Sequence, residues 1–171
     1  LTKLPRDPDF AAAYAAQDLV VADGRPVVWL SHLARQPVEL MPGSDLLLPI
    51  CELAADLSVP VAFFGSDETA LAGAAEVIRA RVPGLDIRHI AAPPMGFDPQ
   101  SPEAETSLRA IAESGAGLCI LALGAPKQEV FAARGRAVAP GVGFACFGAG
   151  LDFLAGRQRR APLWMRRLAL E

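Results

Sequence analysis

Apolar residues along the chain alternate between two kinds of segment. Short runs without a polar break are typical of strands buried on both faces of a parallel sheet, whereas apolar residues three and four positions apart are typical of amphipathic helices. Strands are predicted at 18–22, 60–64, 85–91, 118–123 and 142–147. Helices are predicted at 10–17, 25–33, 44–57, 67–82 and 126–138, and from residues 101 and 151 onward. Because the two kinds alternate almost throughout, we expect a single α/β domain with a mainly parallel sheet and helices on both faces.

Two predicted helix starts depend on particular side chains. Asp9 and Ser44 can each accept a hydrogen bond from a first-turn N–H. Asp7-Pro8-Asp9 matches the pattern of a metal-binding D-x-D motif. Because it follows no apolar strand, we interpret it as the start of a helix. In the helix that begins at Ser44, the expected buried face has the spacing i, i+4, i+7 and i+11 and consists of Leu46, Ile50, Leu53 and Leu57.

The strand–helix corner at 117–129 is the stretch around which the chain is organised. The apolar run ends at Gly124, and Pro126 suits the first position of a helix. Lys127, Gln128 and Glu129 then occupy the first turn. Ligands of open α/β sheets bind at the carboxyl ends of the strands, and helix N-termini suit phosphates. The alternative is an ordinary corner with three exposed polar residues.

Four strand ends are followed by loops that suit a ligand, at 22–24, 64–67, 124–129 and 147–150. In a parallel sheet these loops face the same edge, so we expect them to line one cleft, with glycines allowing close approach of the backbone. Gly148-Ala149-Gly150 is only a fragment of the dinucleotide fingerprint G-x-G-x-x-G, which argues against NAD.

Composition narrows the function classes. The 171 residues are 52% hydrophobic and carry a net charge of −3, which argues against a general nucleic-acid binder. No uninterrupted apolar stretch is long enough for a transmembrane helix, and no signal-peptide pattern is present. Cys51, Cys119 and Cys146 lie in apolar surroundings without metal-ligand spacing and are expected to be buried free thiols. His32 and His89 have no partners at metal-ligand spacing and are expected at the surface or an edge.

Seven motifs occur in a characteristic order along the chain. They are ADG after a short strand, PGSDLL, FFGS, PGL, LGAPKQE, GAGLDFLAG and RAPLWMRRLALE. This series resembles the WecG/TagA/CpsF family of bacterial glycosyltransferases, glycosyltransferase family 26, and it spans about 7–171. The resemblance implies a Rossmann-like fold and transfer of a sugar from a UDP-sugar to an undecaprenyl-diphosphate-linked saccharide. It further implies inversion at the anomeric carbon, no metal or other cofactor, and a peripheral location on the cytoplasmic face of the bacterial plasma membrane during synthesis of cell-surface polysaccharide or teichoic acid.

The resemblance also suggests roles for individual residues. An inverting displacement needs a base for the acceptor hydroxyl and a group that stabilises the leaving diphosphate. Asp23 matches the position of the family's proposed base, although Asp-Gly is also a common turn pair. Lys127 and Gln128 suit the leaving group, whereas Glu129 either belongs to the pocket or satisfies first-turn N–H groups.

The remaining expected substrate-binding residues belong to the same motifs. Asp45 and Asp152 are ambiguous, because an acid in the first turn also interacts favourably with the helix dipole. The full expected set, besides Lys127, Gln128 and Glu129, is Gly24, Gly43, Asp45, Gly65, Ser66, Gly124, Pro126, Gly148, Asp152 and Arg160.

The sequence departs from the family pattern in three places. Leu40 and Met41 stand where members usually have an arginine, and Arg35 is the nearest one. We also expect family sequence before Leu1 and after Glu171. The departures leave open an alternative function, a catalytically weak or inactive UDP-sugar-binding protein. The oligomeric state is also open, a homo-oligomer included.

The C-terminal segment 157–171 has the pattern of a short basic amphipathic helix following a core of residues 1–156. Its apolar side consists of Ala161, Trp164, Met165 and Leu168. Arginines and a tryptophan in this arrangement fit an anionic membrane surface. Two other uses stay open: docking on the core, or arginines that reach over the cleft to a diphosphate.

Overall fold

The computed structural model describes residues 3–156. A 3-10 turn, Leu4–Arg6, precedes α1 (Pro8–Ala15), α2 (Arg25–Leu33) and α3 (Gly43–Asp56). From there strands and helices alternate: β1 (Val61–Gly65), α4 (Glu68–Arg81), β2 (Ile87–Ala91), α5 (Pro102–Glu113), β3 (Leu118–Ala122), α6 (Lys127–Val138), β4 (Gly143–Cys146) and α7 (Gly150–Leu154). The segment 157–171 lies outside the described residues, so its predicted amphipathic helix is not described.

The four strands form one parallel sheet in the order β2-β1-β3-β4. β1 is buried at every position and β3 at every position except Leu118. These two central strands are the unbroken apolar runs of the sequence, which confirms the prediction of buried parallel strands. The α/β fold with helices on both faces is confirmed.

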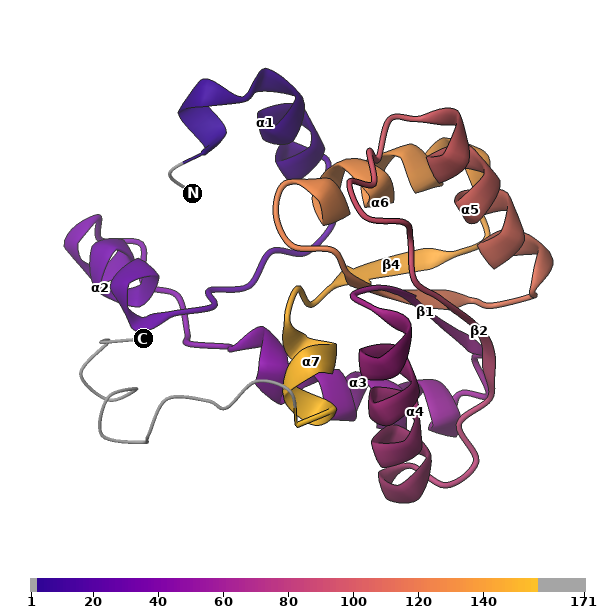
Figure 1. The fold of residues 1–171 in the computed structure, drawn as a ribbon. Helices are drawn as coiled ribbons and strands as arrows, with labels where there is room; N and C mark the ends of the chain where they lie inside the picture. The colour runs from indigo at the N-terminus through magenta and orange to yellow at the C-terminus, as the bar shows by residue number, and fades with distance from the viewer. Residues whose placement is uncertain (1–2, 157–171) are drawn as a thin grey trace.

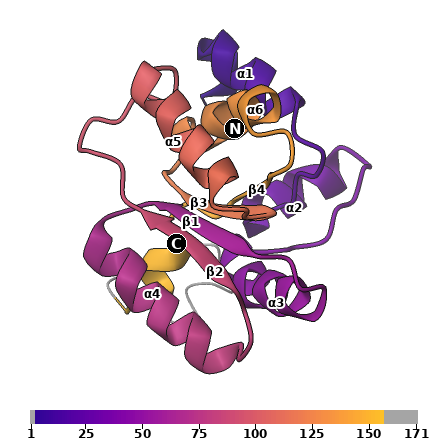
Figure 2. The same cartoon turned by 90° about the vertical axis from the view of Figure 1, so that its right-hand side faces the viewer.

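Side chains of the central strands alternate between two cores. Val61, Phe63 and Ile120 point to the face covered by α3, α4 and α7. Phe64 and Leu121 point to the opposite face, covered by α5 and α6 (Figures 1 and 2). Because each helix buries its apolar stripe against the sheet, the loops at the carboxyl ends of β1, β3 and β4 are held at a common edge.

Several local predictions are confirmed by hydrogen bonds at helix starts. Asp67 accepts from the Ala70 N–H at 3.0 Å and begins α4, and Ser101 accepts from the Ala104 N–H at 3.2 Å and begins α5. The predicted ends of α2 and α6 are also confirmed. His32 is exposed, and His89 lies on the edge strand β2.

The predicted strand at 18–22 is wrong. Ala22 forms a single parallel bridge with Leu40, and no strand is assigned to this stretch. Leu19 is 81% exposed. Within residues 3–156 that bridge is the one β-pairing the stretch makes, so no ladder of hydrogen bonds extends along it.

Two predicted caps are also wrong. The residue that caps α1 is Asp7, whose Oδ1 accepts from the Phe10 N–H at 2.9 Å, rather than Asp9. α3 begins one residue before Ser44, with Pro42 at its N-cap and no side-chain cap. Pro126 likewise stands at the N-cap of α6 rather than at its first helical position. In each case the helix starts within one or two residues of the prediction, which is the usual uncertainty of a helix end.

The buried face of α3 is not the predicted one. Leu53 and Leu57 are 56% and 64% exposed, whereas Leu47, Cys51 and Ala54 are buried. The buried set also has the spacing i, i+4, i+7, so the helix has two adjacent apolar faces. Packing against the sheet and α7 selects one of them, which hydrophobic periodicity cannot decide.

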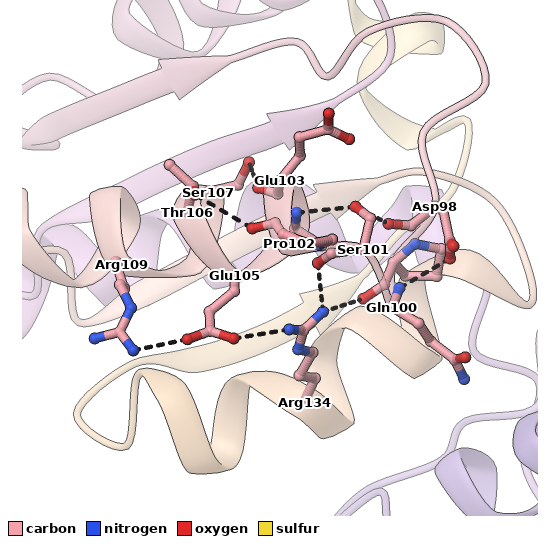
Figure 3. Close-up of polar contacts among 12 residues, drawn as sticks. Asp98, Gln100, Ser101, Pro102, Glu103, Glu105, Thr106, Ser107, Arg109 and Arg134 are labelled. Atoms are coloured by element: carbon pink, nitrogen blue, oxygen red, sulfur yellow. Dashed lines mark hydrogen bonds and ion pairs between the residues drawn. The ribbon is translucent and has the colours of Figure 1, made fainter.

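A polar network around Arg134 ties α6 to the loop that precedes α5 (Figure 3). The guanidinium donates to the carbonyl oxygens of Pro99 and Ser101 at 3.3 and 2.7 Å and pairs with Glu105 at 2.9 Å. Arg109, the stronger influence, and Arg134 lower the pKa of the Glu105 carboxyl. The long connection at 92–101 is therefore attached to the body on the sheet face covered by α5 and α6.

Candidate active site

An open cavity of about 1130 Å³ lies at the carboxyl edge of β4, between the N-terminal part of the chain and the first turn of α6. Segments far apart in sequence line it: the end of α1, 19–27, the start of α3, the first turn of α6, and 144–150. Its volume is slightly above the range of about 300–1,000 Å³ that is usual for small-molecule sites. A second hollow of about 410 Å³ lies at the opposite edge and has no charged side chain in its lining.

Asp23 is placed in this cavity by backbone contacts. The Met41 N–H donates to the Ala22 carbonyl at 2.9 Å, which holds the loop after Ala22 against the start of α3. A Cβ atom at Gly43 would lie 3.8 Å from Asp23 Oδ2 and 3.6 Å from Phe147 Cδ1. The Asp23 carboxylate therefore lies close to the Gly43 backbone, and the side chain is exposed on the cavity wall.

Gln128 connects the first turn of α6 to the loop after β4. Gln128 is 8% exposed, and it is the one buried polar or charged residue among residues 3–156. Its Oε1 accepts from the Gly148 N–H at 3.0 Å, and its Nε2 donates to Glu129 Oε1 at 3.0 Å. A buried amide with both ends bonded is rigid. Gln128 therefore sets the positions of both Gly148 and Glu129 on the cavity wall.

Glu129 has an unusual environment for a carboxylate. Its Oε2 is buried and has no hydrogen-bond partner. Burial, and to a lesser degree the Glu129 charge, raises the pKa of the Cys146 thiol to about 12. The predicted alternative, that Glu129 satisfies first-turn N–H groups, is not seen: α6 has no side-chain cap, and the hydrogen-bond partner of Glu129 is Gln128.

The cavity gathers about half of the residues expected from the sequence. Its lining includes Asp23, Gly24, Gly43, Gln128, Glu129 and Gly148. The residues that do not line it are Asp45, Gly65, Ser66, Gly124, Pro126, Lys127 and Asp152. Lys127 is exposed. Arg160 lies outside the described residues.

Gly65 and Ser66 serve the packing of the sheet edge. A Cβ atom at Gly65 would lie 2.5 Å from the Ala122 carbonyl, and the φ of Gly65 is +126°, so the close approach of two backbones requires glycine here. The Ser66 hydroxyl donates to Asp152 Oδ1 at 2.5 Å. This bond attaches α7 to the end of β1. Asp152 therefore holds α7 in place, and Phe153 of α7 lines the cavity.

Several cavity residues were not expected from the sequence, and three of them carry polar side chains. Arg25 is the one basic side chain in the lining among residues 3–156, and Tyr14 and Gln17 come from the end and the C-terminal side of α1. Because Arg25 directly follows Asp23-Gly24, the sequence already indicated that it lies close to the candidate base. The sequence did not indicate the contribution of α1, because that contribution depends on packing against α6.

Two further properties concern cofactors and membranes. The described residues contain no group of three or more His, Cys, Asp or Glu side chains arranged to hold a metal ion. Cys51 and Cys119 are buried free thiols, as expected, and Cys146 is half-buried. Within 3–156 no helix combines the length and the apolar composition needed to cross a bilayer.

In a comparison with protein-family models, the glycosyl transferase WecG/TagA/CpsF family matches residues 1–171. The chain belongs to this family. Among curated proteins it is 28% identical over 167 residues to the N-acetylglucosaminyldiphosphoundecaprenol N-acetyl-beta-D-mannosaminyltransferase of Bacillus spizizenii strain W23. It is 24% identical over 168 residues to the protein of the same name from Bacillus subtilis strain 168.

Both alignments cover 97% of this chain but 63% of the relative. The chain thus spans less than two thirds of the length of these glycosyltransferases. The family resemblance read from the seven motifs is confirmed, and the cavity contains the candidate base and the first turn of α6 from the PKQE motif.

Proposed function

We propose that the protein to which this chain belongs is a glycosyltransferase. It moves a sugar from a UDP-sugar to a saccharide linked to undecaprenyl diphosphate, with inversion at the anomeric carbon, in cell-surface polysaccharide or teichoic acid synthesis. The observation that carries the proposal is that Asp23, the family's candidate base, is exposed on the wall of a large open cavity in a chain of this family. The names of the two Bacillus relatives describe a lipid-diphosphate acceptor and a transferred N-acetylmannosamine.

The proposed chemistry is a single displacement. The acceptor hydroxyl oxygen forms a bond to the anomeric carbon while the bond from that carbon to the diphosphate oxygen breaks. Asp23 takes the hydroxyl proton, and UDP leaves with the bonding electron pair. Because the new bond forms opposite the one that breaks, the configuration inverts. Asp23 on the cavity wall fits the role of the base.

The leaving diphosphate needs positive charge or N–H donors. Arg25 is the basic side chain that the described cavity offers, and it lies two residues from Asp23. An arginine can bond two phosphate oxygens at once. Lys127 is exposed away from the lining, so we assign the diphosphate to the Arg25 side of the cavity rather than to Lys127. No metal is part of the proposal.

A weak or inactive UDP-sugar-binding protein of the same fold is the second candidate. Leu40, which lines the cavity, and Met41 stand where family members usually have an arginine. Loss of that charge reduces stabilisation of the leaving group more than it reduces binding of the uridine. Ligand binding without turnover in the full-length protein would favour this candidate.

The proposed site of action is the cytoplasmic face of the bacterial plasma membrane, where a polyprenyl-linked acceptor is available. The basic residues of 157–171, Arg160 among them, are proposed to contact anionic lipid or the diphosphate. Both roles stay predictions for residues outside the described part of the chain.

Binding of UDP tests the donor class. Saturating UDP at about 100 times its dissociation constant should stabilise the full-length protein by roughly 2.7 kcal/mol and raise its melting temperature by about 5–10 °C. NAD at the same concentration should leave the melting temperature unchanged, because the G-x-G-x-x-G spacing is not met. A rise with NAD and none with UDP would contradict the proposed donor.

A further inference from the structure

The feature that the proposed mechanism leaves unexplained is the Glu129 carboxylate. Glu129 lines the cavity that holds Asp23, yet one of its oxygens, Oε2, has no hydrogen-bond partner and no solvent contact. A buried carboxylate oxygen without a donor is costly, so its persistence needs an explanation. Because Glu129 lines the cavity, a ligand bound there can supply the missing donor.

Gln128 holds this carboxylate in place without satisfying it. The amide uses its oxygen for the Gly148 N–H and donates from Nε2 to Glu129 Oε1 only. The nearby thiol of Cys146 is a weak donor, and burial together with the Glu129 charge raises its pKa to about 12. The protein thus provides a fixed acceptor and leaves one oxygen for another donor.

The charge of Glu129 decides which part of a nucleotide sugar can approach it. A diphosphate is an anion, and two negative groups in a partly buried site repel each other. Arg25, the basic residue of the described lining, belongs to the part of the cavity wall that follows Asp23 in the chain. A neutral group that carries O–H or N–H donors meets no such repulsion and would form a charge-assisted hydrogen bond.

We propose that Glu129, positioned by Gln128, recognises the sugar to be transferred by accepting a hydrogen bond from one of its hydroxyl or amide N–H groups. This inference rests on the proposed function and refines it. The first turn of α6 then takes the sugar end of the donor, whereas the sequence alone suggested that it takes the diphosphate. Asp23 and Glu129 line one cavity, which agrees with a sugar bound beside the base.

Calorimetry with two probes tests this assignment. UDP and UDP-N-acetylmannosamine are titrated into the full-length wild-type protein, the Glu129→Gln variant and the Glu113→Gln variant. The glutamine side chain introduced by Glu129→Gln is nearly isosteric and can still accept from Gln128, but its second position is an amide donor rather than an acceptor. Glu113 is exposed at the end of α5, at the opposite edge of the sheet, and serves as the control.

The expected result is selective. Wild type and Glu113→Gln should bind the nucleotide sugar more tightly than UDP, and Glu129→Gln should lose about 10- to 100-fold in affinity for the nucleotide sugar alone. Unchanged UDP affinity shows that the variant is folded. An equal loss for both probes, no loss for either, or a wild type that gains nothing from the sugar would overturn the role of Glu129. If wild type binds neither probe, the proposed function itself fails.

Discussion

Replacing Asp23 by asparagine is expected to lower sugar transfer by about 10²–10⁴-fold while leaving UDP affinity nearly unchanged. Asparagine has the shape of aspartate but cannot take the proton of the acceptor hydroxyl. Asp23 is exposed on the cavity wall beside Gly43, and within residues 3–156 its carboxylate forms no ion pair. The variant should therefore fold normally.

The measurement is the initial rate of transfer by the full-length protein, with UDP affinity determined by calorimetry on the same preparations. Asp56→Asn is the matched control, because Asp56 is exposed at the far end of α3. Wild-type turnover in Asp23→Asn would show that another group serves as the base. A parallel loss of UDP affinity would place Asp23 at the nucleotide instead.

The second large effect concerns the end of β1. Gly65→Ala is expected to destabilise the protein by about 3 kcal/mol or more, because overpacking and backbone strain add at this position. The new Cβ would lie 2.5 Å from the Ala122 carbonyl carbon and oxygen, and the φ of Gly65, +126°, is rarely adopted by residues with a side chain. Neither backbone can move without breaking the β1–β3 pairing.

Gly84→Ala separates the two causes. Gly84 also has a positive φ, +93°, but a Cβ there would meet nothing within 4 Å. It should cost only about 1–2 kcal/mol, the cost of the backbone conformation. Urea unfolding of both variants gives the comparison. Equal destabilisation would mean that the contact with Ala122 adds nothing to the cost of the backbone conformation.

The parts of the fold that the sequence predicted well are those set by local chemistry. Unbroken apolar runs identified β1 and β3, and Asp67 and Ser101 marked the helices that they cap. The parts that it predicted poorly depend on neighbours. The stretch 18–22 has the composition of a strand, but Ala22 finds one bridge to Leu40 and no ladder.

The candidate site was likewise predicted only in part from the sequence. Gln128 and Gly148 were placed at one edge by the rule that parallel strands end together, and the structure brings them to one cavity. Asp23 lines the same cavity although the strand on which its placement rested is wrong, because the bond between the Met41 N–H and the Ala22 carbonyl holds its loop there. The rule could not distinguish residues that face the cavity from residues that pack the same edge. Ser66 bonds Asp152, and Gly65 touches Ala122, so both serve the sheet.

Two features of the candidate site could be found only in the structure: the contribution of α1 and the environment of Glu129. α1 reaches the cavity because it packs on α6, which no local pattern encodes. Glu129 follows Lys127 and Gln128 in one motif, yet the three side chains have different surroundings: Lys127 is exposed, Gln128 is buried and Glu129 is half-buried. One turn of a helix points consecutive residues in directions about 100° apart, so a contiguous motif does not imply a contiguous surface.

The most direct test is a transfer assay with the full-length protein. UDP-N-acetylmannosamine is supplied as donor and a synthetic polyprenyl-diphosphate N-acetylglucosamine as acceptor, and the product is analysed by mass spectrometry and by NMR of its anomeric centre. A disaccharide lipid with an inverted anomeric centre, formed by wild type and not by Asp23→Asn, is the predicted result. Tight binding of the donor with no transfer, under conditions in which the Bacillus subtilis relative forms product, would contradict it and leave a UDP-sugar-binding protein.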